Sequence, residues 1–113
     1  ISDSSYIVRR EAIRALGLIT DYRAVNFIIN ASYDYDLEVR TEVAKVLRNF
    51  EDTRVISCLV RMLRDSNERV LCESIYSLGV IGEHDTIIEI RKMLKHESHN
   101  VRKAALEVIK MVK

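Results

Sequence analysis

The chain has 113 residues, of which 48% are hydrophobic and 31% are charged, and its 18 lysines and arginines nearly balance 17 aspartates and glutamates at a net charge of +1. This length and apolar content predict one globular domain with a real core, and the near-zero net charge gives no overall electrostatic argument for nucleic-acid binding. No apolar run in the sequence approaches the roughly 18 residues that a membrane span requires, so we expect no membrane segment.

Proline is absent and there are only three glycines, so the chain lacks the residues that usually end strands and form hairpins. Instead, a single 31-residue period runs through it. The period brings two sets of apolar residues into register: Val8, Val39, Val70 and Val101, and Leu16, Leu47, Leu78 and Ile109. Around these residues, apolar side chains recur at the spacing of one helical face. The sequence therefore predicts an all-α fold built from repeated units.

Seven helices are expected, at residues 5–19, 21–32, 36–50, 53–64, 67–81, 84–95 and 98–112. Each first helix of a repeat begins at a residue that caps helix N-termini well: Ser5, Asp36, Asn67 and Ser98. Asp21 and Asp52 are placed to cap the second helices. In the third repeat, Glu83 and Asp85 compete for that role.

These helices form about three and a half repeats, in which each helical hairpin is stable only when it packs on its neighbour. We expect a right-handed α-α superhelix that makes residues 1–113 a single domain. Ser74 and Ser77 stand at apolar positions of the third repeat and predict close contact between helices there. The missing methionine at position 1 indicates a processed, trimmed or excised segment, and a fragment of a longer solenoid is one form that this can take.

The residues VRREAIRALGLI (8–19) and DYRAV (21–25) resemble the HEAT-like repeats of the phycobilin lyase type. The resemblance spans the chain, although the later copies, VRTEVAKVLRNF with DTRVI, VLCESIYSLGVIG and VRKAALEVIKMV, match less fully. Members of that family often have proline where this chain has Asn26, Ser57 and Ile88. Tetratricopeptide and ankyrin repeats have similar periods, but their signatures are missing. The resemblance implies a HEAT-like α-solenoid.

The same family includes deoxyhypusine hydroxylase, whose di-iron ligands are His-Glu pairs in the first helices of several repeats. The glutamates are present here but the histidines are not, because the pairs read Arg10-Glu11, Thr41-Glu42 and Cys72-Glu73. Arginine, threonine and a single cysteine do not make such an iron site. We therefore expect the three glutamates to be solvated near the first helical turn, where the helix dipole favours a negative charge.

The histidines and cysteines do not indicate a reactive site. His84, His96 and His99 lie near predicted turns and share no helical face, so we expect them to act at helix ends rather than to bind a metal. Cys58 and Cys72 are too far apart for a CxxC pair, and without a nearby activating base both are expected to pack. We expect no catalytic residue, no metal and no cofactor, and a cytoplasmic protein in a reducing compartment.

Three arginines recur near the start of the first helices: Arg9, Arg40 and Arg102. The helix dipole disfavours a cation there, so each arginine needs a partner. We expect Asp21 and Asp52 to be these partners, in a ladder of ion pairs that runs from repeat to repeat.

The last predicted helix has a full apolar stripe and no partner helix after it: Val101, Ala105, Val108, Ile109 and Val112. An uncovered flank of this kind predicts self-association, a truncated longer protein, or docking of another chain at the terminal helix. In the first turn between repeats, Tyr33 and Tyr35 indicate either an exposed contact element or packed tyrosines.

The concave surface of a solenoid is lined by the second helix of each repeat. The candidate binding residues on this surface are Phe27, Asn30, Arg61, Arg64, Arg91, Lys92 and Lys95. Its first third is polar and aromatic, whereas the rest forms a basic strip that suits an acidic peptide or a phosphate backbone. Lysine and arginine also solubilise helix ends, which is a second explanation of the strip.

These features predict a non-enzymatic scaffold that binds a protein partner through the concave face of the second helices. Two alternatives stay open. The first is nucleic-acid binding through the basic strip. The second is a subunit of a bilin lyase-type or other ligand-handling complex, because the resemblance implies subunits that cradle a tetrapyrrole together with its acceptor protein.

Overall fold

A computed structural model describes residues 5–111 of the chain. These residues form seven α-helices, as predicted: α1 (Tyr6–Ile19), α2 (Val25–Ala31), α3 (Leu37–Val46), α4 (Thr53–Met62), α5 (Glu68–Ile81), α6 (Ile87–Lys92) and α7 (His99–Met111). Short 3₁₀ segments extend several of them, at Tyr22–Ala24, Leu47–Asn49, His84–Thr86 and Met93–Lys95. With these extensions, the predicted helix ranges agree with the observed ones to within a few residues.

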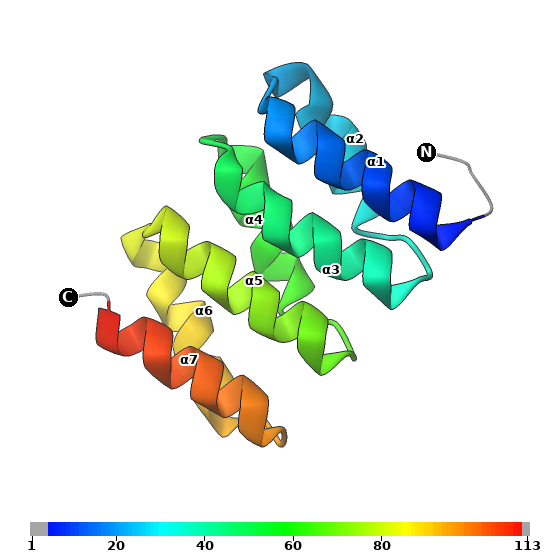
Figure 1. Cartoon of the computed structure of the whole chain (residues 1–113). Helices are drawn as coiled ribbons and strands as arrows, with labels where there is room; N and C mark the ends of the chain where they lie inside the picture. The colour runs from blue at the N-terminus through cyan, green and yellow to red at the C-terminus, as the bar shows by residue number, and fades with distance from the viewer. Residues whose placement is uncertain (1–4, 112–113) are drawn as a thin grey trace.

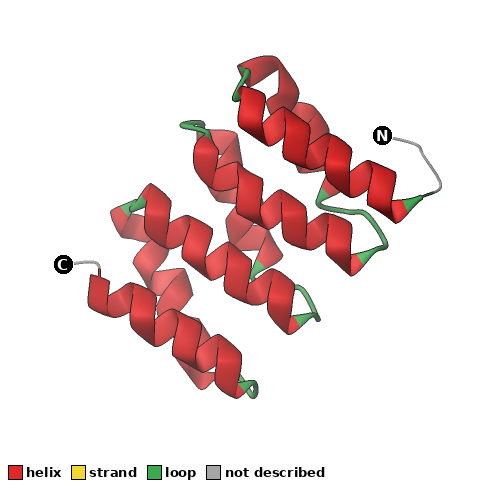
Figure 2. Ribbon diagram, viewed as in Figure 1, coloured by secondary structure: helices red, strands yellow, loops and turns green. Residues whose placement is uncertain are grey.

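The helices form two layers. The first helices of the repeats, α1, α3, α5 and α7, lie side by side in one layer, and α2, α4 and α6 form the second layer behind them (Figures 1 and 2). Within this layer α1 packs on α3, α3 on α5 and α5 on α7, and α1 and α7 stand at opposite ends of the stack (Figure 1). The chain is therefore a helical solenoid, which confirms the predicted fold class.

The core lies between the two layers. Val39, Val43 and Leu47 of the second repeat are fully buried, as the predicted apolar stripe requires. Ile13 and Ile75 are also fully buried, although they lie outside that stripe, because a first helix contacts both the neighbouring repeats and its own second helix. Ser74 and Ser77, at 0% exposure, confirm the predicted close helix contact in the third repeat.

Side-chain caps start most of the helices. The prediction is confirmed for five residues whose side chains accept a hydrogen bond from a backbone N–H: Asp21, Asp36, Asp52, Asn67 and Ser98. Ser5 precedes α1 in the N-cap position. In the third repeat Glu83, rather than Asp85, holds the N-cap position, but its side chain makes no capping hydrogen bond. The shortest capping hydrogen bonds are thus those to aspartate or asparagine side chains.

The predicted arginine ladder exists, but its predicted partners are wrong. Arg9 Nε donates to Asp34 at 2.8 Å and Arg40 Nε donates to Asp65 at 2.8 Å, so both carboxylates come from the turns between repeats. Asp21 and Asp52 lie at the opposite end of the hairpins, where they pair with arginines of their own turns.

The third arginine of the ladder binds the backbone instead. Arg102 Nη1 donates to the carbonyl oxygens of His96 and Glu97 at 2.7 and 2.9 Å. His96 stands 31 residues after Asp65, where its Nδ1 accepts the backbone N–H of Ser98 at 3.0 Å. Asp34 and Asp65 accept the equivalent backbone N–H, so the histidine reproduces this hydrogen bond but not their negative charge.

The prediction of an uncovered apolar flank on the last helix is wrong. Val101, Ala105 and Val108 are almost completely buried, because α7 packs on both α5 and α6. Ile109 is partly buried, and Val112 lies outside the described residues. The outer side of α7 is formed mostly by polar or charged residues: Lys103, Leu106, Glu107 and Lys110. The apolar stripe on which self-association through the terminal helix was predicted is therefore covered by the chain's own helices.

The first helix shows the opposite behaviour. Val8 and Ile19 belong to the predicted apolar stripe, yet they are 50% and 65% exposed. Their equivalents in the second repeat, Val39 and Phe50, are buried, in keeping with the packing of α3 on α1. The exposed apolar flank of the described residues is therefore on α1.

Candidate binding surface

A groove lies between α4 and α6, on the layer of second helices. Its volume is about 480 Å³, and eight residues line it: Ser57, Val60, Arg61, Leu63, Arg64, Glu89, Lys92 and Met93. Three of the predicted binding residues, Arg61, Arg64 and Lys92, are thus brought together. Apolar side chains form part of its walls, so the groove combines cations with surface on which aliphatic groups can pack.

Arg61 is held in place by the first repeat. Its Nη2 donates to the Ser32 hydroxyl at 2.6 Å, and its guanidinium lies 4.0 Å from the centre of the Tyr33 ring. A weaker contact, 3.4 Å, joins the same nitrogen to the Cys58 sulfur. These cation–π and hydrogen-bond contacts orient the planar guanidinium of Arg61 within the groove.

The other cations of the predicted strip are more exposed. Lys92 Nζ lies 3.2 Å from a Glu89 carboxylate oxygen, so part of its charge is balanced within the groove. Arg64, Arg91 and Lys95 are exposed and form no ion pair with the residues in the range 5–111. The strip is therefore not a continuous line of free positive charge, because an acidic side chain stands inside it.

Phe27 and Asn30 do not belong to this groove. Phe27 is 59% exposed on α2. Asn30 lines a separate hollow of about 230 Å³, which it shares with Arg9, Ala31, Tyr33, Asp34 and Val39. The predicted concave surface is thus divided into a cationic groove over the second and third repeats and a smaller hollow over the first.

Both tyrosines of the first turn contact arginines. Tyr33 stacks on Arg61, and the Tyr35 ring centre lies 5.0 Å from the Arg9 guanidinium, although the two residues are 70% and 81% exposed. Both interpretations of this turn therefore hold in part: each tyrosine ring packs on an arginine, and the rest of the ring is exposed.

Cys58 packs in the core, as the sequence analysis expected. The residue is 4% exposed because it stands on the face of α4 that carries the core residues Val55 and Leu59. Burial raises the pKa of its thiol, and the contacts with Ser32 and Arg61 oppose this only in part. Burial also raises the pKa of Cys72. Both thiols therefore stay protonated at neutral pH, as expected of packing residues rather than nucleophiles.

The three glutamates of the first helices form ion pairs. Glu42 is buried, with its carboxylate 3.0 Å from Arg14, so the expectation that it is solvated is wrong. Glu73 pairs with Arg48 at 2.8 Å, and Glu11 is exposed beside Arg14. Residues 5–111 contain no group of three or more histidine, cysteine, aspartate or glutamate side chains arranged to hold a metal ion. Glu42 and Glu73 thus join neighbouring repeats, whereas Glu11 pairs within its own helix.

The apolar walls of the groove are what the sequence analysis missed. Val60, Leu63 and Met93 lie at the border between the core face and the outer face of their helices, so a simple division into inward and outward positions assigns them to the core. A 3₁₀ turn at Met93–Lys95 shifts the end of the second helix and brings Met93 to the groove.

None of the described helices combines the length and apolarity that a bilayer crossing requires.

Comparison with known proteins places the chain among repeat proteins. A family model described as HEAT repeats matches residues 1–71. The chain is 32% identical to the bilin biosynthesis protein PecE of Nostoc sp. over 106 residues, which cover 93% of this chain and 42% of that protein. It is 31% identical to the phycocyanobilin lyase subunit alpha of Picosynechococcus sp. over 119 residues, which cover 95% of this chain and 44% of that subunit.

A further relative is protein YibA of Escherichia coli, which is 32% identical over 79 residues that cover 68% of this chain and 28% of that protein. Among solved structures, a chain of the complex of CpcE and CpcF of phycocyanin lyase from Nostoc sp. superposes with a TM-score of 0.87 at 23% identity, covering 96% of this chain and 75% of that chain. The chain spans less than half the length of the curated relatives. It belongs to the HEAT-repeat family, and its repeats are of the HEAT-like type found in phycobilin lyase subunits.

Proposed function

We propose that this chain is the protein-binding part of a bilin lyase-type subunit and that it supplies contacts rather than reacting groups. The groove between α4 and α6 carries the proposal, because Arg61, Arg64 and Lys92 surround apolar walls there. Such a surface fits a protein segment with carboxylates beside aliphatic side chains. The high thiol pKa values of Cys58 and Cys72 support a role without a nucleophile.

The relatives support the class of complex. Two of them, which align with 93% and 95% of this chain, are named for bilin biosynthesis and for a phycocyanobilin lyase subunit. The structural neighbour is part of a complex of two such subunits. In that setting the chain would form one wall of an assembly that brings a bilin to its acceptor protein, and the groove would hold the acceptor or the second subunit.

The groove is tested by reversing its charge. The variant in which Arg61, Arg64 and Lys92 are all changed to glutamate should bind phycocyanin apoprotein, or a CpcF-type subunit, at least about 100-fold more weakly than the unchanged chain. Biolayer interferometry measures this. The matched control makes the same change in charge outside the groove, at Lys45, Lys103 and Lys110, and should bind normally. Equal losses in both variants would contradict a specific groove.

The lyase part is tested separately. The chain and a CpcF-type subunit are incubated with phycocyanobilin and phycocyanin apoprotein, and covalently attached bilin is followed by absorbance after denaturation. We expect attachment to depend on the chain and to be lost in the groove variant. If the chain binds the apoprotein but attachment never occurs, the bilin lyase class is wrong and only the protein-binding scaffold stands.

Nucleic-acid binding is the alternative outcome of the same variants. The Glu89 carboxylate within the groove counts against a phosphate backbone there. A nucleic-acid site would show affinity that falls steeply with salt concentration and disappears on charge reversal, whether or not a protein partner is present. Such behaviour with a random-sequence oligonucleotide would overturn the proposal.

A further inference from the structure

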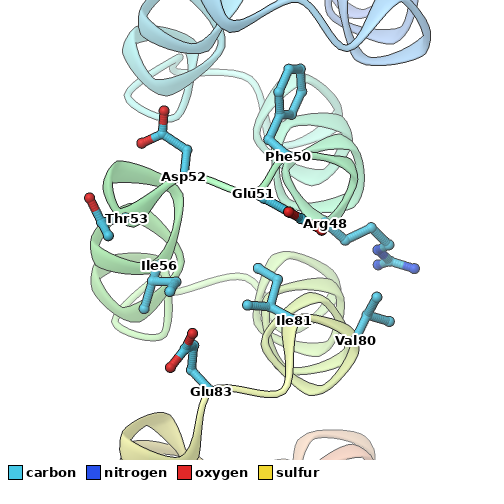
Figure 3. A pocket seen from close by; sticks show the side chains of 9 residues that line it. All are labelled: Arg48, Phe50, Glu51, Asp52, Thr53, Ile56, Val80, Ile81 and Glu83. Carbon is cyan, nitrogen blue, oxygen red and sulfur yellow. The ribbon is translucent and has the colours of Figure 1, made fainter.

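A second opening lies at the turns that join first and second helices, between the second and third repeats. It measures about 560 Å³ and is lined by Arg48, Phe50, Glu51, Asp52, Thr53, Ile56, Val80, Ile81 and Glu83. Figure 3 shows Ile56 from α4 and Ile81 from α5 on two sides of it, with the Glu83 carboxylate nearby. We call this opening the turn crevice. It is separate from the groove between α4 and α6, with which it shares no lining residue.

The same place between the first and second repeats is bridged by a tyrosine. Tyr22 Oη reaches across that junction and donates to the backbone carbonyl oxygen of Glu51 at 3.2 Å. One period later, the position of Tyr22 is taken by Thr53, and that of Glu51 by Gly82. A threonine side chain is too short to span the junction, so the turn crevice stays open because a bridging ring is missing there.

The walls and the rim of the turn crevice differ in chemistry. Ile56 and Ile81 are partly buried, and Val80 is 60% exposed, so the walls offer apolar surface to a ring. Glu51 and Glu83 are exposed at the rim and form no ion pair within residues 5–111. The one cation of the lining, Arg48, is already bound to Glu73 at 2.8 Å and to Ser77 at 2.9 Å. The rim therefore carries uncompensated negative charge.

We propose that the turn crevice is a docking site for a tyrosine side chain of a partner protein that has a lysine or arginine beside it. The ring would pack between Ile56 and Ile81, as the ring of Tyr22 bridges the preceding junction, and its hydroxyl would donate to the Gly82 carbonyl. The neighbouring cation would pair with Glu51 or Glu83. This inference does not rest on the proposed function, since the groove and the crevice use different residues.

The probe for this site is the acetylated and amidated tripeptide lysine-tyrosine-lysine. Titration into the isotope-labelled chain, followed by NMR, should give saturable shifts of the backbone amides of Thr53, Ile81 and Glu83, with a Kd on the order of 1 mM because one ring and one ion pair are buried. The tripeptides lysine-alanine-lysine and glutamate-tyrosine-glutamate should bind at least about tenfold more weakly. Shifts elsewhere, or no saturation by about 10 mM peptide, would overturn the proposal.

Two variants locate the site. Thr53→Tyr supplies the missing ring from within the chain and should weaken peptide binding at least about tenfold, whereas Ser66→Tyr adds the same ring at an exposed position of another turn and should leave binding unchanged. The double variant Glu51→Gln and Glu83→Gln keeps the shape, and should weaken binding about threefold and remove its salt dependence. If either crevice variant, folded by circular dichroism, binds like the unchanged chain, the site is wrong. If the groove variant loses binding of the apoprotein but still binds the tripeptide, the crevice stands, because the two sites share no lining residue.

Discussion

The junctions between first helices are built in two ways. Where α1 meets α3 and where α5 meets α7, a glycine lies against a valine, in the pairs Gly17 with Val46 and Gly79 with Val108. Where α3 meets α5, the glycine position is occupied by Arg48 and the valine position by Ser77, whose hydroxyl accepts from Arg48 Nε at 2.9 Å.

The difference shows that the three junctions share the same close packing of a small residue against a larger one, although the residues themselves differ. In both kinds of junction, one helix presents a small residue and the other presents a larger one, so the helices can approach closely. The middle junction exchanges the two sizes between the helices and replaces an apolar contact by polar ones. Ser77 donates to the Ala44 carbonyl oxygen, and Arg48 also pairs with Glu73 at 2.8 Å. At this pair of positions the outer junctions depend on shape, while the middle one depends on hydrogen bonds.

The largest effect is expected at the middle junction. Ser77→Val places the valine of the outer junctions opposite an arginine, removes the acceptor of Arg48 Nε and overfills a position with 0% exposure. We expect the free energy of unfolding to fall by about 2–4 kcal/mol. Urea denaturation followed by far-ultraviolet circular dichroism measures this.

A double-mutant cycle tests whether this loss comes from the mismatch. Arg48→Gly combined with Ser77→Val rebuilds the glycine and valine pair, and should be more stable than the sum of the single losses by about 1–2 kcal/mol. The single variant Arg48→Gly is the control for the helix-weakening effect of glycine itself. Additive losses would mean that the two positions do not form one contact.

A smaller effect is expected at the outer junctions. A Cβ on Gly17 would lie 2.5 Å from Val46 Cβ, whereas a Cβ on Gly79 would lie 2.8 Å from a methyl carbon of Val108 and 3.5 Å from its Cβ. We expect Gly17→Ala to lower the free energy of unfolding by about 1–2 kcal/mol, since overpacking outweighs the gain in helix propensity. Gly79→Ala is the matched comparison and should cost less than about 1 kcal/mol. Equal losses, measured by the same denaturation, would contradict the difference in fit.

Most of the fold could be predicted because the sequence contains several copies of the same repeat. The 31-residue spacing of Val8, Val39, Val70 and Val101 locates every first helix, and caps such as Asp36 and Asn67 mark where helices begin. Repetition turns weak local signals into agreement among copies. The exposure of Val8 was not predictable in this way, because a period cannot distinguish an end of the stack from its middle.

The sites were less predictable because they depend on contacts between repeats. The sequence showed that Arg40 needs a carboxylate, but which turn supplies it depends on the end of the hairpin at which that turn lies. The cations Arg61, Arg64 and Lys92 were identified from their helical positions, whereas the apolar wall of their groove was not. The turn crevice has one sequence signal, which is the threonine at position 53 where the first repeat has a tyrosine.

A still smaller loss of stability is expected from the arginine ladder, in which Arg9 and Arg40 form ion pairs and Arg102 binds backbone carbonyl oxygens instead. Arg40 donates to Asp65 at 2.8 Å and to the carbonyl oxygens of Asp34 and Tyr35 at 2.9 and 3.0 Å. Arg40→Ala should therefore lower the free energy of unfolding by roughly 1 kcal/mol, since it leaves a partly buried carboxylate without its cation. Arg69→Ala removes an exposed ion pair with Glu38 and should change it by less than about 0.5 kcal/mol. An unchanged thermal midpoint for Arg40→Ala would show that the ladder has no structural role.

The smallest expected effect is a dependence of the fold's stability on low pH, which arises at the first junction. Burial raises the pKa of Asp34, but the hydrogen bonds from Arg9 and from the Asp36 backbone N–H outweigh it, so the pKa lies below its ordinary value. The charged form of Asp34 therefore stabilises the fold above the unfolded pKa of roughly 4, and this stabilisation is lost as the pH falls toward the lower folded pKa. Asp34→Asn should lower the thermal midpoint at neutral pH and flatten its fall below about pH 4. Asp85→Asn, at an exposed carboxylate, is the control and should keep the shape of the curve. If both variants retain the full acid dependence, the Arg9–Asp34 pair does not link the first two repeats, and that junction is held by the Gly17–Val46 contact, the Arg14–Glu42 pair and the Tyr22 bridge.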